Sequence, residues 1–305
     1  MPASTPDTRY AKPAPMPRVT DKQLDHLKRH GYVVVPRFLS PRELKQAHRG
    51  MLQYFPSPEE LAATPHRYSA MMDNADFLQL EFPFDEQVFN HQALHPRVLD
   101  FVERLLGTEE VALSRAALWA KYAGFGEFEQ PMHVDYEGNT LVVPRDDGDY
   151  RQVNVILYYS DVDEMLGPTE VLSQEHTRDD LLWPPFRSRE EWPAFYEKAT
   201  PILAKAGDML IFSMRTFHRA TAITADIGVR FTQHLVFRSR THGFQGHELW
   251  SSHGEKHELA TFLTKASPKQ REALGFPKVG DPYWNDATLA GVKRRYTKMD
   301  LRPYR

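Results

Sequence analysis

The chain has 305 residues, a formal net charge of −3, 41% hydrophobic residues and no cysteine. The lack of cysteine excludes a disulfide framework and any thiolate metal site, and it fits a cytoplasmic protein. The nearly balanced charge gives no support for nucleic-acid binding. No apolar run approaches the roughly 20 residues that a membrane span needs. We therefore expect a soluble globular protein without nucleic-acid or membrane partners.

The front of the chain predicts an arm, a helix, a strand and a second helix. Residues 1–19 are rich in proline and lack the apolar segment of a signal peptide, so we expect a disordered arm. Thr20-Asp21-Lys22-Gln23 is a capping box, and Gly31 can end the helix that it starts. A β-branched run at residues 32–36 predicts a short strand. Ser40-Pro41-Arg42-Glu43 then predicts a second, stronger helix start.

Between residues 111 and 240 the pattern changes to short β-prone runs separated by turn residues. Such runs, bounded by glycine, proline and aspartate, are typical of strands. Many short strands with long insertions favour a double-sheet jelly roll or barrel. The predicted strands are residues 111–122, 152–161, 169–172, 208–212 and 229–237.

We expect one domain over residues 20–305. Its parts are a helical segment at 20–110, the jelly-roll core at 111–240 and a C-terminal extension at 241–305. The extension is too rich in aromatic residues for a free linker, so it is expected to pack on the core. An aromatic insertion at residues 179–200 is expected to form a lid or the contact surface of a homodimer.

The most informative motif is His133-Val134-Asp135. If a strand runs through it, His133 and Asp135 point to the same side, because side chains alternate along a strand. His218 follows an apolar run that would deliver it to the end of a core strand. Two imidazoles and one carboxylate on one face of an iron ion leave positions open for other ligands. The alternatives are a solvated pair at a strand end and a histidine that bonds a local carbonyl.

Arg230 lies in an apolar setting, between Val229 and Phe231. A buried guanidinium needs a planar anion, and a carboxylate fits it with two hydrogen bonds. An aspartate or glutamate with a structural role is one candidate partner for Arg230. Because Arg230 follows the proposed iron ligand His218 by twelve residues, the far carboxylate of 2-oxoglutarate is the better candidate. Thr221 or Thr224 could add a hydroxyl to the same carboxylate.

A second group of histidines lies in the tail and could bind zinc. Its i,i+4 pair does not have the glutamate beside the first histidine, as metalloprotease motifs do. A glycine within the pair also weakens a helix there, so a solvated polar tail is the favoured interpretation. The histidines are His242, His247, His253 and His257.

With these motifs in order, the chain resembles the phytanoyl-CoA dioxygenase family of iron(II)/2-oxoglutarate oxygenases. The similar segments are the opening run at 27–40, the iron motif at 130–135, the turn at 167–176 and the closing half from 207 to 230. The resemblance implies a double-stranded β-helix, a cupin-like jelly roll, with iron at its open end.

The resemblance also implies roles for individual residues. His133, Asp135 and His218 would be the catalytic iron ligands, and Arg230 would bind 2-oxoglutarate. Lys121 is the candidate for a lysine that contacts the cosubstrate in this family. The ligand carboxylate of Asp135 favours hydroxylation over halogenation.

The expected activity is therefore oxidation of an unactivated C–H bond in a small molecule, using O₂ and 2-oxoglutarate. A non-catalytic β-sandwich with a vestigial metal site and a zinc hydrolase remain alternatives. Aromatic residues expected to line or cover the pocket, or simply to pack in the core, are Phe125, Phe128, Tyr136, Trp183, Trp192 and Tyr196. Cations that could hold an acidic substrate group are Arg67, Arg115 and Arg151, among which the sequence does not select.

Overall fold

Both helices at the front of the chain begin where their capping residues predict, and the first also ends where predicted, at Gly31. In the computed structural model, α1 (Asp21–His30) carries the capping box of Thr20 and Gln23 and ends at Gly31 with φ of 79°. β1 (Tyr32–Val35) follows, and α2 (Pro41–Tyr54) starts at the capping box of Ser40 and Glu43. The structure describes residues 19–69, 78–124, 129–135, 152–178, 182, 184–240 and 256–305.

Helices predominate before β3, strands predominate from β3 to β11, and helices alone follow. They are α3 (Pro58–Ala63), β2 (Leu78–Glu81), α5 (Gln87–Ala93), α6 (Pro96–Leu106), β3 (Val111–Tyr122), β4 (Met132–His133), β5 (Gln152–Tyr158), β6 (Thr169–Val171), β7 (Phe186–Arg187), α7 (Pro193–Glu197), β8 (Thr200–Ile202), β9 (Met209–Ser213), β10 (His218–Ala220), β11 (Val229–Ser239), α8 (His257–Lys265), α9 (Pro268–Ala273) and α10 (Asp286–Arg295), with short 3-10 turns at Pro65–Tyr68, Gln174–His176 and Arg302–Tyr304.

Two antiparallel sheets form the core. The larger has the strand order β1-β9-β5-β11-β3-β2, and the smaller has the order β7-β4-β10-β6-β8. Neighbours in the sheets are distant in sequence, as expected of a jelly roll. The prediction of a mainly β, cupin-like jelly roll with flanking helices is confirmed.

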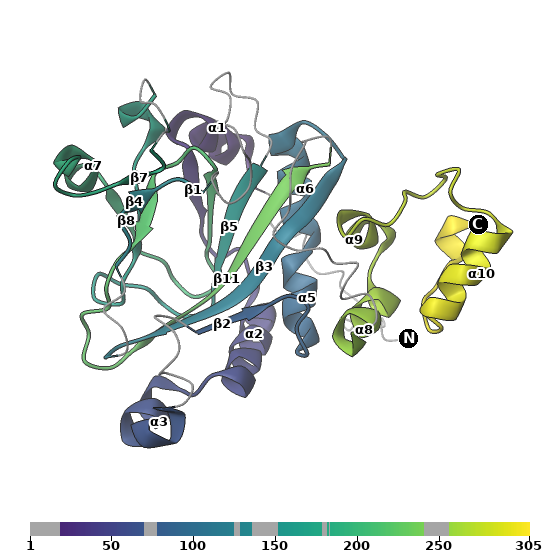
Figure 1. Ribbon diagram of the computed structural model, residues 1–305, viewed down its shortest axis with the longest axis horizontal. Coiled ribbons are helices and arrows are strands. Elements are labelled where there is room, and N and C mark those ends of the chain that lie inside the picture. The colour runs from purple at the N-terminus through teal and green to yellow at the C-terminus, as the bar shows by residue number, and fades with distance from the viewer. Residues whose placement is uncertain are drawn as a thin grey trace, which may run out of the picture.

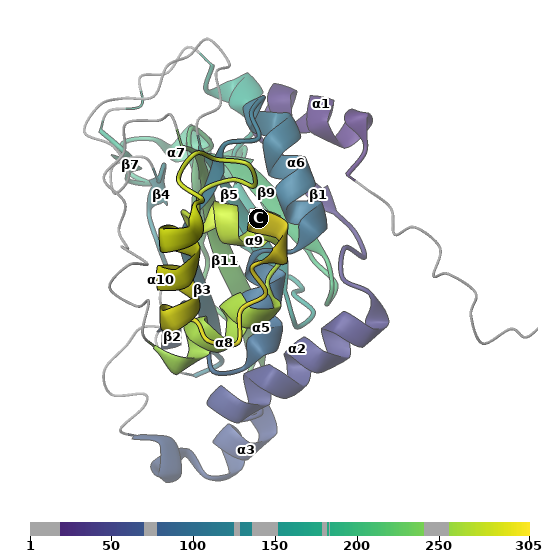
Figure 2. The same cartoon turned by 90° about the vertical axis from the view of Figure 1, so that its right-hand side faces the viewer.

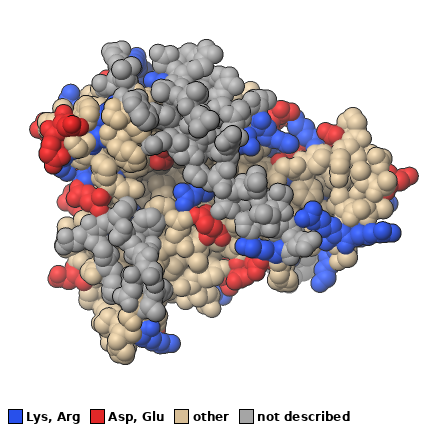
Figure 3. Space-filling view, viewed as in Figure 1, with Lys and Arg blue, Asp and Glu red and all other residues tan. Residues whose placement is uncertain are grey.

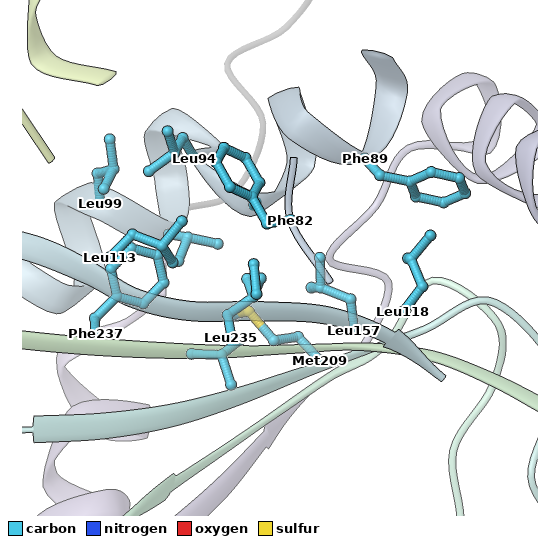
Figure 4. Packing of buried hydrophobic residues seen from close by; sticks show 14 of the residues in the cluster. Phe82, Phe89, Leu94, Leu99, Leu113, Leu118, Leu157, Met209, Leu235 and Phe237 are labelled. Atoms are coloured by element: carbon cyan, nitrogen blue, oxygen red, sulfur yellow. The ribbon is translucent and has the colours of Figure 1, made fainter. Parts of the chain in front are cut away.

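The larger sheet separates an apolar core from the interior of the jelly roll. Along β11, Phe231, Leu235 and Phe237 are buried in the hydrophobic cluster that the sheet forms with the helices. Figure 4 shows Leu235 and Phe237 close to apolar side chains of the neighbouring strands and to Phe82 and Leu94. Because side chains alternate along a strand, Arg230, Thr232 and His234 face the smaller sheet. Figures 1 and 2 show α5, α6, α8 and α9 on the opposite side of the larger sheet, whereas α7 lies beside the smaller sheet.

The C-terminal helices cover part of this helical layer. Gln270 on α9 donates to the Leu94 carbonyl at 2.9 Å, and Gln87 on α5 donates to the Glu258 carbonyl of α8 at 3.2 Å. Phe262 is fully buried in the main core. Figure 3 shows both signs of charge scattered over the face in view, with basic side chains gathered where Figure 1 places α10.

The insertion that was predicted to form a lid or dimer surface contributes a strand to the smaller sheet. Within its described residues, β7 pairs with β4, and Phe195 packs against Phe217 in a second apolar cluster. Residues 179–181 and Trp183 lie outside the described residues, as do residues 1–18 of the predicted arm. None of the described helices is long and apolar enough to cross a membrane.

A partly buried acid joins α2 to α6. Glu43 accepts hydrogen bonds from the Ser40 backbone at 2.7 Å and from His95 at 3.0 Å, and Arg97 lies 3.9 Å away. The hydrogen bond from His95 is the largest effect that lowers the pKa of Glu43, from 4.5 to about 2. The ionised carboxylate therefore contributes stability above about pH 4.5, and this contribution is lost as the pH falls toward 2.

Replacing Glu43 by Gln should lower the free energy of unfolding by about 1–3 kcal/mol at pH 7, because the buried partners lose a charged acceptor. Urea unfolding from pH 7 down to pH 3 should show the difference from wild type shrinking below about pH 4.5. The exposed Glu59 serves as the control, and Glu59→Gln should change stability by less than about 0.5 kcal/mol. An equal loss at every pH would contradict this account.

Candidate metal centre and cavity

Pairing between two short strands brings the two candidate histidines together. β10 pairs with β4 through His218 and His133, whose ring centroids are 4.4 Å apart. Asp135 follows two residues after His133. One carboxylate oxygen is 3.5 Å from Nε2 of His133, and the other is 3.4 Å from Nε2 of His218. Within the described part of the chain, these three form the one group of potential metal ligands close enough to share an ion.

Backbone carbonyls fix which nitrogen of each imidazole faces Asp135. Nδ1 of His133 is 2.9 Å from the Pro131 carbonyl, and Nδ1 of His218 is 3.0 Å from the Thr216 carbonyl. A carbonyl only accepts, so Nδ1 carries the proton in both rings. Nε2 is left to bind a metal ion, as is usual for histidine ligands held by a hydrogen bond on the other nitrogen.

Asp135 is held as an anion. Burial alone would raise its pKa, but the neighbouring His218 and His133 outweigh burial and hold the pKa well below its ordinary value. Nδ2 of Asn154 donates to the carboxylate at 3.0 Å and orients it. Ligands at adjacent corners around an ion lie about 3 Å apart when the bonds are about 2.1 Å long. Two neutral nitrogens and one carboxylate at 3.4–3.5 Å therefore fit a divalent ion with little movement.

The three residues open onto a cavity of about 270 Å³ between the sheets. Its walls come from both sheets and combine apolar, aromatic and cationic side chains. The lining residues are Arg115, Trp119, Gln130, His133, Val134, Asp135, Asn154, Val155, Ile156, Thr169, Phe186, Phe212, His218, Arg219, Ala220, Arg230, His234, Leu235 and Val236.

Arg230 forms the buried cationic end of this cavity. It is 5% exposed, and burial lowers its pKa. Its guanidinium donates to the Gly167 carbonyl. Gly167 has φ of 64°, and a Cβ at this position would lie 2.7 Å from the Thr221 carbonyl oxygen, so only glycine fits. Tyr158 is fully buried nearby, where burial raises its pKa and Arg230 opposes the rise.

Lys121 lies directly opposite Arg230 in the pairing of β3 with β11. Its ammonium donates to the Thr221 carbonyl at 2.6 Å. Burial and the neighbouring Arg230 lower the pKa of Lys121 to about 7. Two cations placed side by side on one face repel one another. This arrangement favours an anion between or beside them.

Some of the site residues predicted from the sequence line the cavity, and others lie outside its lining. His133, Asp135, His218 and Arg230 line one cavity. The Thr221 hydroxyl donates to the Pro168 carbonyl at 2.7 Å, beside rather than within the lining.

Of the aromatic residues expected at the pocket, Trp192 and Tyr196 pack in the second apolar cluster behind β4. Phe125, Phe128, Tyr136 and Trp183 lie outside the described residues, as do Arg151 and the tail histidines His242, His247 and His253. His257 is exposed at the start of α8.

Sequence reasoning missed Asn154, His234 and the aromatic wall formed by Trp119 and Phe186. The signal for Asn154 was present, since it is the one amide inside the apolar run Val153–Tyr158 of β5. His234 lies four residues after Arg230 on the same face of β11. Burial, Arg230 and Arg115 lower the pKa of His234 to about 3, so its ring is neutral.

Comparison of the chain with known protein families agrees with the fold and the metal centre described above. The sequence profile of the family described as phytanoyl-CoA dioxygenase (PhyH) matches residues 27–230. The chain belongs to this family, which makes it a non-haem iron oxidoreductase dependent on 2-oxoglutarate. Among curated proteins, no sequence matches the chain.

Solved structures with a similar fold include enzymes crystallised with metal and cosubstrate. The epimerase SnoN, in complex with Fe3+, alpha ketoglutarate and nogalamycin RO, is 18% identical, with a TM-score of 0.51 over 72% of this chain and 84% of its own. The carbocyclase SnoK from nogalamycin biosynthesis is 17% identical, with a TM-score of 0.52 over the same shares of 72% and 84%. HygX from Streptomyces hygroscopicus with iron bound is 15% identical, with a TM-score of 0.54 over 74% and 88%. At these identities, the likeness concerns the fold.

The centre predicts a stabilising effect of metal that depends on Asp135. Anaerobic iron(II) at 100 times its dissociation constant should raise the free energy of unfolding by about 2.7 kcal/mol. Asp135→Ala should lose this gain, because the remaining imidazoles lack the anionic ligand. The exposed Asp25 provides the control, and Asp25→Ala should respond like wild type. Equal stabilisation of Asp135→Ala by iron would disprove the ligand assignment.

Proposed function

We propose that the protein oxidises an unactivated C–H bond of a small organic substrate, consuming O₂ and 2-oxoglutarate and releasing succinate and CO₂. The observation that supports this most is the position of His133, Asp135 and His218. They lie on the wall of a cavity that also contains the buried guanidinium of Arg230. A metal held from one side by three ligands keeps its other positions open toward that cavity.

The proposed roles follow from the contacts of each residue. His133 and His218 bind iron through Nε2, and Asp135 binds it through its carboxylate. Bound iron(II), 2-oxoglutarate and O₂ supply the oxidising chemistry. Arg230 binds the far carboxylate of 2-oxoglutarate and exchanges the Gly167 carbonyl for it. Lys121 adds positive charge beside Arg230.

Apolar rings hold the two imidazoles in place. Phe186 stacks on His133 with centroids 5.7 Å apart, and Phe212 contacts His218 at 4.4 Å. These contacts limit rotation of the two imidazoles, and Phe212, which is itself buried, shields one face of His218 from water. A rigid set of ligands is what ordered oxygen chemistry requires.

The neighbours support a small-molecule substrate. SnoN was crystallised with nogalamycin RO, and HygX with hygromycin B, in a similar fold. We propose an organic small molecule for this chain as well. Thr221 remains a proposed cosubstrate contact through its hydroxyl, which in this structure donates to the Pro168 carbonyl, close to Lys121.

Anaerobic titration of the protein with iron(II) and then 2-oxoglutarate tests the proposal. A weak visible charge-transfer band should appear when the keto acid chelates the metal, and exposure to air should then yield succinate. His133→Ala should abolish the band. Arg230→Gln should weaken 2-oxoglutarate binding by about 2–4 kcal/mol, because the far carboxylate loses its charged partner.

Arg42→Gln, at an exposed position on α2, is the control for the titration and should leave the band unchanged. A wild-type protein that binds iron(II) but gives no band would refute the oxygenase. That result would favour zinc hydrolysis or a binding protein instead.

We expect the binding of 2-oxoglutarate to depend on pH, because Lys121 loses its charge near pH 7. Below about pH 7 its ammonium is charged and attracts 2-oxoglutarate, and above that pH the charge is progressively lost. The dissociation constant for 2-oxoglutarate should therefore rise about threefold to tenfold between pH 6 and pH 8.5, or roughly 0.7–1.4 kcal/mol. Lys121→Met should bind more weakly at pH 6 and show a flatter profile. An identical pH profile in this variant would exclude Lys121 from the site.

A further inference from the structure

A second arginine faces the cavity at the level of the metal ligands. Arg115 on β3 is paired with Val236 on β11, and Val236 is paired with Asn154 on β5. Asn154 is the residue that orients Asp135. Residues paired across neighbouring strands point to the same face, and strands are about 4.8 Å apart. Arg115 therefore lies roughly two strand spacings, or about 10 Å, across the sheet from Asn154.

Arg115 keeps hydrogen-bond capacity for a ligand. Its only hydrogen bond within the described residues joins one Nη to Glu81 Oε1 at 2.9 Å. The guanidinium also lies over the Trp119 ring, with its carbon 6.0 Å from the centroid. An arginine has five N–H donors in a planar fork, and a single contact with Glu81 fixes its direction while leaving one edge open. With 32% of its side chain exposed, Arg115 is accessible from the cavity.

The other cations on the cavity wall have different partners. Arg219 is held by Glu129 and Glu170. Arg230 lies six residues along β11 from Val236, the residue opposite Arg115. That is roughly 20 Å along the strand, so the two arginines define separate anion sites. The neutral ring of His234 adds no charge near Arg115.

Two aromatic side chains, Phe186 and Trp119, contribute to the wall of the same cavity. Phe186 is 51% exposed although it is paired directly with His133 and stacks on its ring. Trp119 stacks on His234 with centroids 4.4 Å apart and adds a second ring to the lining. An exposed aromatic side chain within a cavity offers a flat apolar surface to the body of a ligand.

From these positions we infer that the substrate is a small carboxylic acid. Its carboxylate binds the open edge of Arg115, which Glu81 positions, and its apolar body lies against Phe186 and Trp119. This places a C–H bond of the body beside the iron ligands. The inference rests on the proposed function and adds the chemical class of the substrate. It also selects Arg115 over Arg67, which lies on the surface and pairs with Glu60.

Matched pairs of acids and amides test the inference without knowledge of the natural substrate. Hexanoate and hexanamide, phenylacetate and phenylacetamide, and leucine and leucinamide differ within each pair by one carboxylate. Each would be titrated anaerobically into protein saturated with iron(II) and 2-oxoglutarate, by calorimetry and by the shift of the visible band. Saturating 2-oxoglutarate keeps the probes away from Arg230. At least one acid should bind tenfold or more tightly than its amide.

Arg115→Gln should reduce this preference to less than threefold while the 2-oxoglutarate band persists. Arg67→Gln is the matched control and should retain the full preference. If Arg115→Gln fails to fold, Arg115→Lys serves as the test variant. It keeps the positive charge but loses the planar fork of the guanidinium. The preference for the acid over the amide should then fall at least threefold.

Several results would overturn the inference. Wild-type protein that shows the band but prefers no acid over its amide refutes the carboxylate site and leaves the oxygenase intact. A preference that survives in the folded Arg115 variants places the carboxylate elsewhere. Loss of the band in wild type itself refutes the proposed function, and the inference is refuted with it.

Discussion

The cross-strand pairing of His133 with His218 is the constraint on which the site depends. Opposed residues in antiparallel strands place their side chains a few ångströms apart on one face, and β4 is only two residues long. Carbonyls at both strands then turn each Nε2 toward Asp135. A register shift of one residue in either strand would send an imidazole to the other face, so metal binding and the fold of the smaller sheet are specified together.

The larger sheet makes that arrangement rigid. One face of β11 packs against the helices through Phe231 and Leu235, and the other presents Arg230 and His234 to the cavity. Alternation with period two thus puts an apolar core and a polar interior on a single strand. Burying Arg230 costs free energy unless an anion pairs with it. The buried guanidinium therefore favours an anionic ligand in the cavity, the role proposed for 2-oxoglutarate.

Much of this could be predicted from the sequence, because local patterns decide it. Capping residues marked the helix starts, and the motif marked His133 and Asp135 as neighbours, although β4 ends at His133 and Asp135 lies in the turn that follows. The family resemblance supplied their partners. Asn154 stands out as the one amide in an apolar strand, but its partner Asp135 could not be predicted, nor could Arg115 be chosen among the arginines, because both depend on register across three strands. For the same reason, the sequence left open whether Trp192 lines the pocket or packs elsewhere, and the structure packs it, partly buried, against the second apolar cluster.

The most direct test of the central claim is a crystal structure of the protein grown anaerobically with iron(II) and 2-oxoglutarate. The account predicts the metal bound to Nε2 of His133, Nε2 of His218 and the Asp135 carboxylate. The far carboxylate of 2-oxoglutarate should lie on Arg230, with the hydrogen bond to Gly167 broken. Iron held by other residues, or Arg230 still bound to Gly167 with the cosubstrate elsewhere, would contradict it.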